Sequence, residues 1–346
     1  MKYMLMCFKN CKFNPMSVLS IVVMVFSSLV SVSSSTWLGV WVGFELNLLS
    51  FMVLMNLESK WAISPCTKYF IIQSLGSGLI LMTFLCDEIL YSDEWNELVL
   101  CAGVMLKGGI APFHFWVPSI VNSTTWLAGG LILSWQKLAP LFLMGWLFSD
   151  WMIIVGASLS ALVGGVGGLN QHSIRGLMVY SSFVHTSWMM LALISSFSLF
   201  VFYWLVYSVS LVLMFWSCFK VSKQFLKSKM RVFHSCLSLL MLSGLPPFLG
   251  FVSKLLVMMS INSVVVFVSV IGSVISLKYY LSALYSFIFG HVYWDTDCSQ
   301  DISFIVIVSV FLNVLGFLLV VIGCYQKSLL WFGAYDSAAV SYLLLK

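Results

Sequence analysis

Charge is the scarcest property of this sequence. Only 8% of the 346 residues are Asp, Glu, Lys or Arg, whereas 61% are hydrophobic and the mean hydropathy is +1.03. A soluble domain carries roughly 25% charged residues, so the composition excludes a water-soluble globular enzyme. Nine cysteines, most of them inside apolar runs, are too dilute for a disulfide-stabilised secreted scaffold. The composition is that of a polytopic helical membrane protein.

Motifs for redox centres and nucleotides are also missing. The sequence has no Cys-x-x-Cys pair, no Gly-x-Gly-x-x-Gly after a strand and no phosphate-binding loop ending in Gly-Lys-Ser/Thr. Cys7 and Cys11 are four residues apart, which we interpret as incidental rather than as half of a metal site. Glycine groups such as 164–168 lie in apolar stretches, where small residues let helices approach closely. We therefore expect no metal or cofactor in this chain.

Apolar runs of the length that crosses a bilayer, about 20 residues, follow one another along the chain. They predict about eleven transmembrane helices, at 16–32, 36–57, 69–85, 98–117, 125–148, 151–169, 174–197, 199–219, 232–259, 263–289 and 302–324. We expect an all-α polytopic protein with one integral membrane domain, and a further short or interfacial helix at 329–345. The first run continues into the next spans without a small-residue cleavage site, so no secretory signal is expected.

Basic residues in the loops predict the orientation. If the spans alternate, eleven Lys and Arg residues fall on one side and two on the other. The N-terminus and the basic loop at 220–231 then face the compartment where the chain is synthesised, and the acidic loop at 87–97 faces the opposite one. The basic loop is interpreted as a solvated element that sets topology, although it could also contact anionic lipid headgroups or an acidic partner.

Ionisable residues inside the spans are the strongest functional signal. Glu45, Lys107, Lys137 and Lys254 each lie several residues from a predicted helix end. A charge at the bilayer centre costs roughly 2.5–3.5 kcal/mol, so these four would cost on the order of 10 kcal/mol if they faced lipid. They must face the protein interior or internal water. Groups that exchange protons under the influence of neighbours form a proton relay; the alternative is structural ion pairing with snorkelling. Lys278 is left undecided, because it could lie near an interface.

Two of the charged spans are interrupted by helix-breaking residues. Lys107 is followed by Gly-Gly and Pro112, and Lys254 is preceded by Gly244, Pro246 and Pro247. Proline within a span frees backbone carbonyls that only water or neighbouring groups can satisfy. Broken helices beside an ionisable residue are typical of ion pathways in transporters. We expect a polar side chain or ordered water near the carbonyls of residues 242 and 243, within reach of Lys254.

The histidines allow two interpretations each. A continuous helix would place His114 on the same face as Lys107, although Pro112 weakens that expectation. His185 shares a helix face with Ser181 and Ser182 and could connect waters to them. His114 and His185 are therefore candidate auxiliary relay residues, with a hydrogen-bonded structural role as the alternative. His234 is expected in a loop or at the end of a span.

Seven sequence blocks between residues 41 and 254 share a family pattern. They read WVGFELNLLSF (41–51), KYFIIQS (68–74), LKGGIAPFHFWVP (106–118), WQKLAP (135–140), GLNQ (168–171), YSSFVHTSW (180–188) and GLPPFLGFVSK (244–254). Together they resemble the antiporter-like subunit 2 family of NADH dehydrogenase, the mitochondrial respiratory complex I. Lys278 departs from that pattern, in which a basic residue stands slightly later, at a position like Ser282.

The resemblance implies a membrane-arm subunit with inverted repeats of five helices, here assigned to 16–148 and 151–289, followed by a C-terminal helix and tail at 302–346. It implies a proton relay of Glu45, Lys107, Lys137 and Lys254 that couples quinone reduction to proton translocation across the mitochondrial inner membrane, with the N-terminus in the matrix. NADH, FMN, iron–sulfur clusters and ubiquinone are then expected in partner subunits. Expected partners are the other membrane-arm subunits and lipids, including cardiolipin, and no nucleic acid.

Two other functions fit the same residues. A stand-alone cation/proton antiporter would use the same broken helices without electron-transfer partners. A structural spacer subunit would contain the same polar residues without conducting protons. The native mass of the assembly distinguishes the first from a complex I subunit, and a pumping assay on variants of the buried charges distinguishes the second.

Overall fold

The computed structural model describes residues 15–58, 63–89, 93–219, 229–246, 248–261 and 265–289, together with 310–311 and 313–314. Nearly all of the predicted span at 302–324, the helix expected at 329–345 and most of the basic loop lie outside the described residues. The helices are α2 (Pro15–Ser33), α3 (Trp37–Glu58), α4 (Ile63–Ile89), α5 (Asp93–Gly108), α6 (Trp116–Ser123), α7 (Trp126–Leu133), α8 (Leu138–Leu147), α9 (Asp150–Gly168), α10 (Ile174–Ser195), α11 (Phe197–Phe219), α12 (Lys229–Ser243), α13 (Leu249–Ser260) and α14 (Val265–Phe289).

The all-α polytopic fold is confirmed. Within the described part of the chain, eight helices, counting α7 and α8 as one, are long and apolar enough to cross a membrane. Ten of the predicted spans correspond to these helices or to pairs of shorter ones. The start of α4 was predicted too late: the helix begins at Ile63 and includes Pro65, because proline is tolerated in the first turn, where its missing N–H would have no partner.

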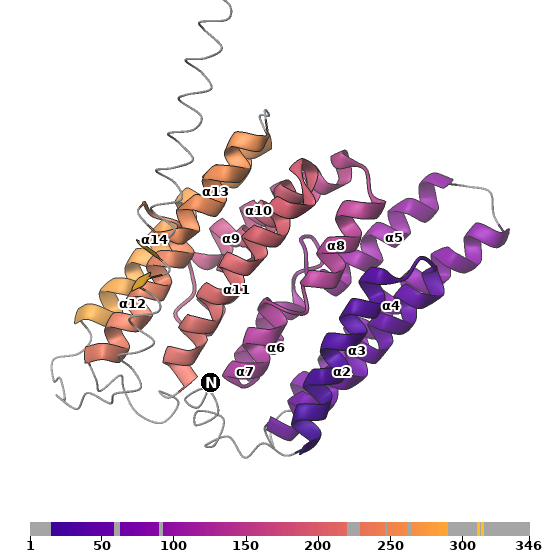
Figure 1. The fold of residues 1–346 in the computed structure, drawn as a ribbon, viewed down its shortest axis with the longest axis horizontal. Coiled ribbons are helices and arrows are strands. Elements are labelled where there is room, and N and C mark those ends of the chain that lie inside the picture. The colour runs from indigo at the N-terminus through magenta and orange to yellow at the C-terminus, as the bar shows by residue number, and fades with distance from the viewer. Residues whose placement is uncertain are drawn as a thin grey trace, which may run out of the picture.

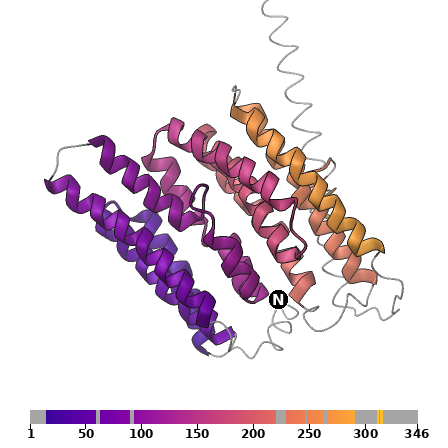
Figure 2. The same cartoon turned by 180° about the vertical axis from the view of Figure 1, so that it is seen from behind.

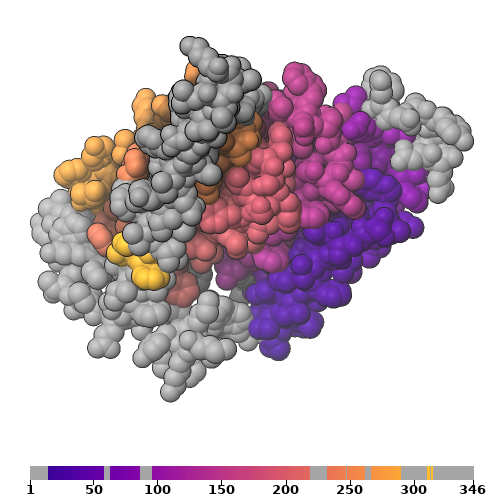
Figure 3. Space-filling model, turned by 45° about the horizontal axis from the view of Figure 1, so that its top comes forward, coloured from indigo at the N-terminus to yellow at the C-terminus, as the bar shows by residue number. Residues whose placement is uncertain are grey.

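The helices lie side by side and broadly follow the order of the sequence, except that α9 packs between α10 and α14. In Figures 1 and 2, α2 to α4 form one end of the molecule, α5 to α8 follow, and α12 to α14 form the other end. The space-filling view shows the same progression from indigo to orange across one face (Figure 3). The densest pairings are α9 with α10, and α2 with α3. Along the molecule, α5 packs against α8, α8 packs against α10, and α10 packs against α13.

The outer surface is apolar, unlike that of a soluble protein, and the largely apolar core contains buried polar residues. Helix α2 exposes Leu19, Val22 and Phe26, while Ser27 and Ser31 on its other side are buried against the neighbouring helix. Each buried serine hydroxyl donates to a backbone carbonyl one turn earlier, at 3.0 Å for Ser27 and 2.8 Å for Ser31. Such hydroxyls need no water to be satisfied, so they can lie inside a bilayer.

Glycine permits close helix approach at two crossings in the second half of the chain. A Cβ on Gly164 of α9 would come within 2.7 Å of the backbone oxygen of Tyr180 in α10. A Cβ on Gly272 of α14 would come within 2.7 Å of the carbonyl oxygen of Ala161 in α9. These contacts agree with the packing role predicted for glycines in the apolar stretches.

Three spans are broken near their middles. The breaks after Lys107 and before Lys254 were predicted, and each begins with a glycine of positive φ, at +62° for Gly109 and +71° for Gly244. The third separates α7 from α8. The predicted span at 125–148 is confirmed as one candidate membrane span, but the sequence did not indicate the break inside it. The cause is Pro140, which has no N–H to donate to the carbonyl of Gln136 and crowds that carbonyl.

Candidate functional site

At the first break, α5 ends inside the protein, and its last carbonyls still accept hydrogen bonds from protein groups. Gly109 N–H donates to Leu106 at 3.2 Å and Ile110 N–H to Met105 at 3.0 Å, the pattern of a helix closed by a left-handed glycine. The indole of Trp116 also donates to the Leu106 carbonyl, at 3.1 Å. Since helix-end carbonyls need partners wherever water is excluded, these bonds allow α5 to stop in mid-span.

Lys107 lies in the last turn of α5 and is only 4% exposed. Its amine lies 4.6 Å from the centre of the Phe44 ring, a cation–π contact across to α3. Its backbone carbonyl accepts a 3.2 Å hydrogen bond from the side-chain amide of Gln73 in α4. The carbonyl end of a helix carries a partial negative charge that stabilises a nearby cation, so the helix end itself compensates part of the charge of Lys107.

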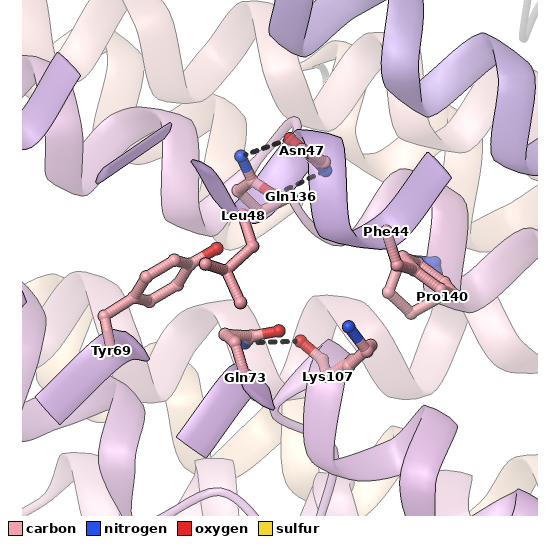
Figure 4. A pocket seen from close by; sticks show the side chains of 8 residues that line it. All are labelled: Phe44, Asn47, Leu48, Tyr69, Gln73, Lys107, Gln136 and Pro140. Carbon is pink, nitrogen blue, oxygen red and sulfur yellow. Dashed lines mark hydrogen bonds between the residues drawn. The ribbon is translucent and has the colours of Figure 1, made fainter. Parts of the chain in front are cut away.

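A small pocket, with room for about one water molecule, adjoins Lys107 (Figure 4). Its lining residues come from α3, α4, α5, α8 and the break before α8: Phe44, Asn47, Leu48, Tyr69, Gln73, Lys107, Gln136 and Pro140. Figure 4 shows the side-chain amides of Asn47 and Gln136 paired on one side, and Gln73 with Lys107 on the other. The amide pair is reciprocal, with donor–acceptor distances of 2.9 Å and 3.1 Å. The pocket therefore extends from Lys107 to the residue before Lys137.

The second break carries Lys137 between α7 and α8. Gln136 N–H donates to Leu131, five residues earlier, at 3.0 Å, so the chain makes a wide turn at this point. The 2% exposed Lys137 amine donates to the hydroxyl of Ser182 in α10 at 2.9 Å. It also lies 5.3 Å from the centre of the Phe183 ring. Lys137 is thus held by neutral oxygens and an aromatic face.

The third break joins Lys254 of α13 to the end of α12. The Lys254 amine donates to the carbonyl oxygen of Ser243 at 2.9 Å, and the side chain is 5% exposed. A Cβ on Gly244 would come within 2.8 Å of this amine, so only glycine leaves room for it. Lys254 itself is thus a polar partner of the freed Ser243 carbonyl. Snorkelling to the surface, the alternative for Lys254, does not occur.

His185 lies between the second and third breaks. Its Nδ1 is 2.9 Å from the hydroxyl of Tyr203 in α11. His185 follows Ser182, the residue that holds Lys137, by three positions in α10, and α10 also packs against α13, the helix of Lys254. A buried imidazole with a donor and an acceptor nitrogen can accept a proton on one side and release one on the other. We call Lys107, Lys137, His185 and Lys254 the buried lysine axis.

The other two candidate residues lie beside this axis. His114 is 8% exposed, and its Nδ1 is 3.1 Å from the carbonyl of Pro112. Because α5 ends at Gly108, His114 does not share a helix face with Lys107 as a continuous helix would require. Its ring instead meets the edge of Phe183, at 5.3 Å between centroids. His114 therefore contacts the aromatic ring that Lys137 faces.

Glu45 of α3 is half-buried, and its charge acts on Lys107. The aromatic ring against the Lys107 amine belongs to the preceding residue, Phe44. Glu45 and Lys107 are thus brought into the same neighbourhood. Lys278 of α14, left undecided by the sequence, is an exposed residue of the described chain and stands outside the axis.

The side-chain amides of the site were not among the residues predicted from the sequence. Asn47, Gln73 and Gln136 line the pocket, yet none of them titrates and insertion cost does not select them. Their signal was present as buried amides in the otherwise apolar blocks at 41–51, 68–74 and 135–140. Ser182 was predicted only as a neighbour of His185, whereas its hydroxyl also holds Lys137. Within the described residues, no group of three or more His, Cys, Asp or Glu converges as a metal site would require.

The family model for NADH:quinone oxidoreductase/Mrp antiporter transmembrane subunits matches residues 34–93 and 91–277. Relatives named NADH-ubiquinone oxidoreductase chain 2 are similar over most of the chain. The one from Mytilus edulis is 43% identical over 277 residues, covering 79% of this chain and 87% of the relative. The one from Anopheles gambiae is 36% identical over 286 residues, covering 77% and 84%.

Solved structures of lower identity share the fold. A chain of respiratory complex I from Thermus thermophilus with bound aureothin has a TM-score of 0.75 at 20% identity, covering 88% of this chain and 78% of that one. A chain of the membrane-bound sulfane sulfur reductase, an archaeal respiratory membrane complex, has a TM-score of 0.75 at 17% identity, covering 90% and 73%. The matched region 34–277 contains all three breaks. The chain therefore belongs to the NADH-ubiquinone oxidoreductase chain 2 family.

Proposed function

We propose that this chain is a membrane-arm subunit of the proton-translocating NADH:ubiquinone oxidoreductase of the mitochondrial inner membrane, and that the buried lysine axis carries its protons. The observation that supports the relay is the position of the three lysines. Each is at least 95% buried, and each lies at or against a broken helix. NADH, FMN, the iron–sulfur clusters and ubiquinone are assigned to the partner subunits, and cardiolipin is among the expected lipid contacts.

The proposed mechanism begins at Lys107. A carboxylate near a lysine favours the protonated amine, and moving the carboxylate away favours release of the proton. Each 1.4 kcal/mol of changed interaction alters proton affinity about tenfold. A small change in the separation of Glu45 and Lys107 would therefore pass a proton through the pocket at Asn47 and Gln136. Lys137 would receive it, and His185 would connect Lys137 to Lys254, with His114 as an auxiliary group beside Phe183.

Replacing Lys107 with Met tests the coupling role. We expect Lys107→Met to suppress quinone reduction and proton pumping together in the assembled complex. Oxidation of NADH by an artificial acceptor should continue, because that reaction is assigned to other subunits. Lys278→Met is the matched control, since it removes an exposed lysine from a spanning helix, and it should leave both activities near the parental level. If pumping per electron is unchanged in assembled Lys107→Met, the relay role of Lys107 is wrong.

The orientation is a separate part of the proposal. We assign the N-terminus and the loop at 220–231 to the matrix, and the loop at 87–97 to the intermembrane space. Helix α5 begins at the upper side of the helix layer in Figure 1 and α12 begins at the lower side. The two loops that precede them therefore lie on opposite sides, which is compatible with this assignment. In intact mitoplasts, a protease should therefore cut an epitope inserted at 87–97 and spare one inserted at 220–231. Cleavage of the second and protection of the first would reverse the orientation.

A further inference from the structure

His234 of α12 has no role in the axis described above. The sequence suggested a loop or span-end position, but the residue lies within α12 and is only 3% exposed. Neither its Nδ1 nor its Nε2 has a hydrogen-bond partner within the described part of the chain. A buried polar atom without a partner costs roughly 1–3 kcal/mol, and both nitrogens of one ring are in that position. Such a group is retained where water or a proton reaches it.

Buried polar residues continue from His234 along α12. Ser238 follows His234 by four residues and Leu242 follows Ser238 by four, so all three lie on one face of the helix. Ser238 is 2% exposed, and the carbonyl of Ser243, the residue after Leu242, accepts the 2.9 Å hydrogen bond from Lys254. Eight residues of helix span about 12 Å. The face therefore leads from His234 to the axis.

Helix α11 presents a matching stripe. Tyr207, Ser210, Met214 and Ser217 recur at intervals of three and four residues and are all at most 4% exposed. The hydroxyl of Ser238 contacts the Met214 sulfur at 3.3 Å, which brings the two polar faces together. Since α11 and α12 are consecutive spans that run in opposite directions, this contact sets Ser217 opposite the turn of α12 that contains His234.

The inner end of this stripe reaches the axis at Tyr207. Its ring lies 4.8 Å from that of His185, and its hydroxyl has no hydrogen-bond partner among the described residues. The serine hydroxyls of the stripe donate to their own helix carbonyls, at 2.7 Å for Ser210 and 2.9 Å for Ser238. Their oxygens keep lone pairs free to accept hydrogen bonds. Serine oxygens that can accept hydrogen bonds thus line the seam between α11 and α12. Its inner end holds the Tyr207 hydroxyl and its outer end the His234 ring, neither of which has a hydrogen-bond partner among the described residues.

We propose that His234 is the outer proton-carrying residue of a hydrated path between α11 and α12, which connects His185 to the end of the layer where α12 begins. The ligand of this path is water, and the transferred species is a proton that moves on and off the imidazole of His234. This inference rests on the proposed relay function of the axis, because the path has no destination if His185 and Lys137 carry no protons.

The first test uses proton pumping by the assembled complex in proteoliposomes. Glutamine can hydrogen-bond with water but cannot carry a proton at neutral pH, so His234→Gln should slow coupled turnover at least about tenfold. His172→Gln is the control, because it removes an exposed histidine that precedes α10, and it should pump normally. Parental turnover in assembled His234→Gln would overturn the inference. If Lys137→Met measured in the same assay loses pumping, the proposed relay through the buried lysine axis is retained and only the path through His234 is rejected.

A second measurement keeps the inference testable if His234→Gln does not assemble. A cysteine placed at 234 should react with a small, charged methanethiosulfonate applied in water, because the path is hydrated. Leu239→Cys is the matched control, since Leu239 lies on the same helix, is 0% exposed and stands outside the polar face. Fragment-ion mass spectrometry assigns each label to its position, because native Cys236 lies in the same tryptic peptide as residues 234 and 239. Equal or slower labelling at 234 than at 239 would mean that the seam is dry and the path does not exist.

Discussion

Replacing Lys137 with Met is expected to stop coupled NADH:quinone turnover almost completely, to below about a tenth of the parental rate. Lys137 occupies the middle of the axis, 2% exposed, and its amine is held by the Ser182 hydroxyl at 2.9 Å. A positioned group that transfers protons typically contributes 10² to 10⁴ in rate. Met has a similar length and no titratable atom, so it removes the proton carrier while filling most of the space.

Lys137→Arg distinguishes a relay from a structural cation. Arginine stays protonated under all conditions relevant to the enzyme, so a relay should fail with Arg as it fails with Met. If only a fixed positive charge beside Phe183 were needed, Arg would restore turnover. Ser182→Ala should have a smaller effect, because it removes one hydrogen-bond partner of the amine and leaves the amine in place. Quinone-linked activity, pumping and NADH oxidation by an artificial acceptor would be measured on the same assembled complex. Full turnover in Lys137→Arg would contradict proton transfer through this residue.

Much of the fold could be predicted because the bilayer imposes simple physical limits. An apolar run of about 20 residues has few alternatives to a spanning helix, and nearly all helix positions followed from that rule. Two of the three breaks were also predictable, since Gly-Gly-Ile-Ala-Pro after Lys107 and Gly-Leu-Pro-Pro before Phe248 do not continue a helix. The break at Lys137 was missed because its cause, Pro140, follows the lysine by three residues and lies inside the next helix.

The lysines of the axis could be selected from insertion cost, whereas most of their partners could not. The sequence offers these three lysines one acidic residue within the predicted spans, Glu45. The structure supplies the Ser243 carbonyl for Lys254, the Ser182 hydroxyl for Lys137 and the Phe44 ring for Lys107. The Ser243 carbonyl lies near Lys254 in the sequence, and the local proline pattern predicted it within reach. The contacts of Lys137 and Lys107 join residues far apart in the chain, and no local pattern encodes them. The helix ends add a further stabilisation of about 0.3–1 kcal/mol for a nearby cation, which depends on where each break falls.

His234 shows the opposite limit of sequence reasoning. The residue was expected in a loop or at the end of a span, three residues after Arg231. The helix instead begins at Lys229 and draws His234 into the interior. Local composition describes the average environment of a segment, but the burial of one side chain depends on the face that the helix turns toward α11 and α14.

Replacing Gly250 with Ala is expected to have the largest effect on assembly. Gly250 lies in the first turn of α13, and a Cβ there would overlap the carbonyl oxygen of Met241 in the last turn of α12. The obstacle is backbone, so no side-chain rotation can relieve it and the two helix ends must separate. Overpacking in a tight core usually costs 1–3 kcal/mol and occasionally more, and we expect the upper end of that range. The same separation would pull Lys254 from the Ser243 carbonyl, since that 2.9 Å bond spans the crossing.

The matched control is Gly78→Ala in α4, where an added Cβ would meet no atom within 4 Å. Alanine is the better helix former by about 1 kcal/mol, so Gly78→Ala should assemble at least as well as the parental chain. Native electrophoresis of solubilised membranes and the melting temperature of the complex measure both variants. Gly250→Ala should lower the amount of intact complex and its melting temperature, and the fraction that assembles should pump poorly because Lys254 has lost its carbonyl. Normal assembly together with normal pumping would mean that α12 and α13 do not cross as tightly as this contact requires.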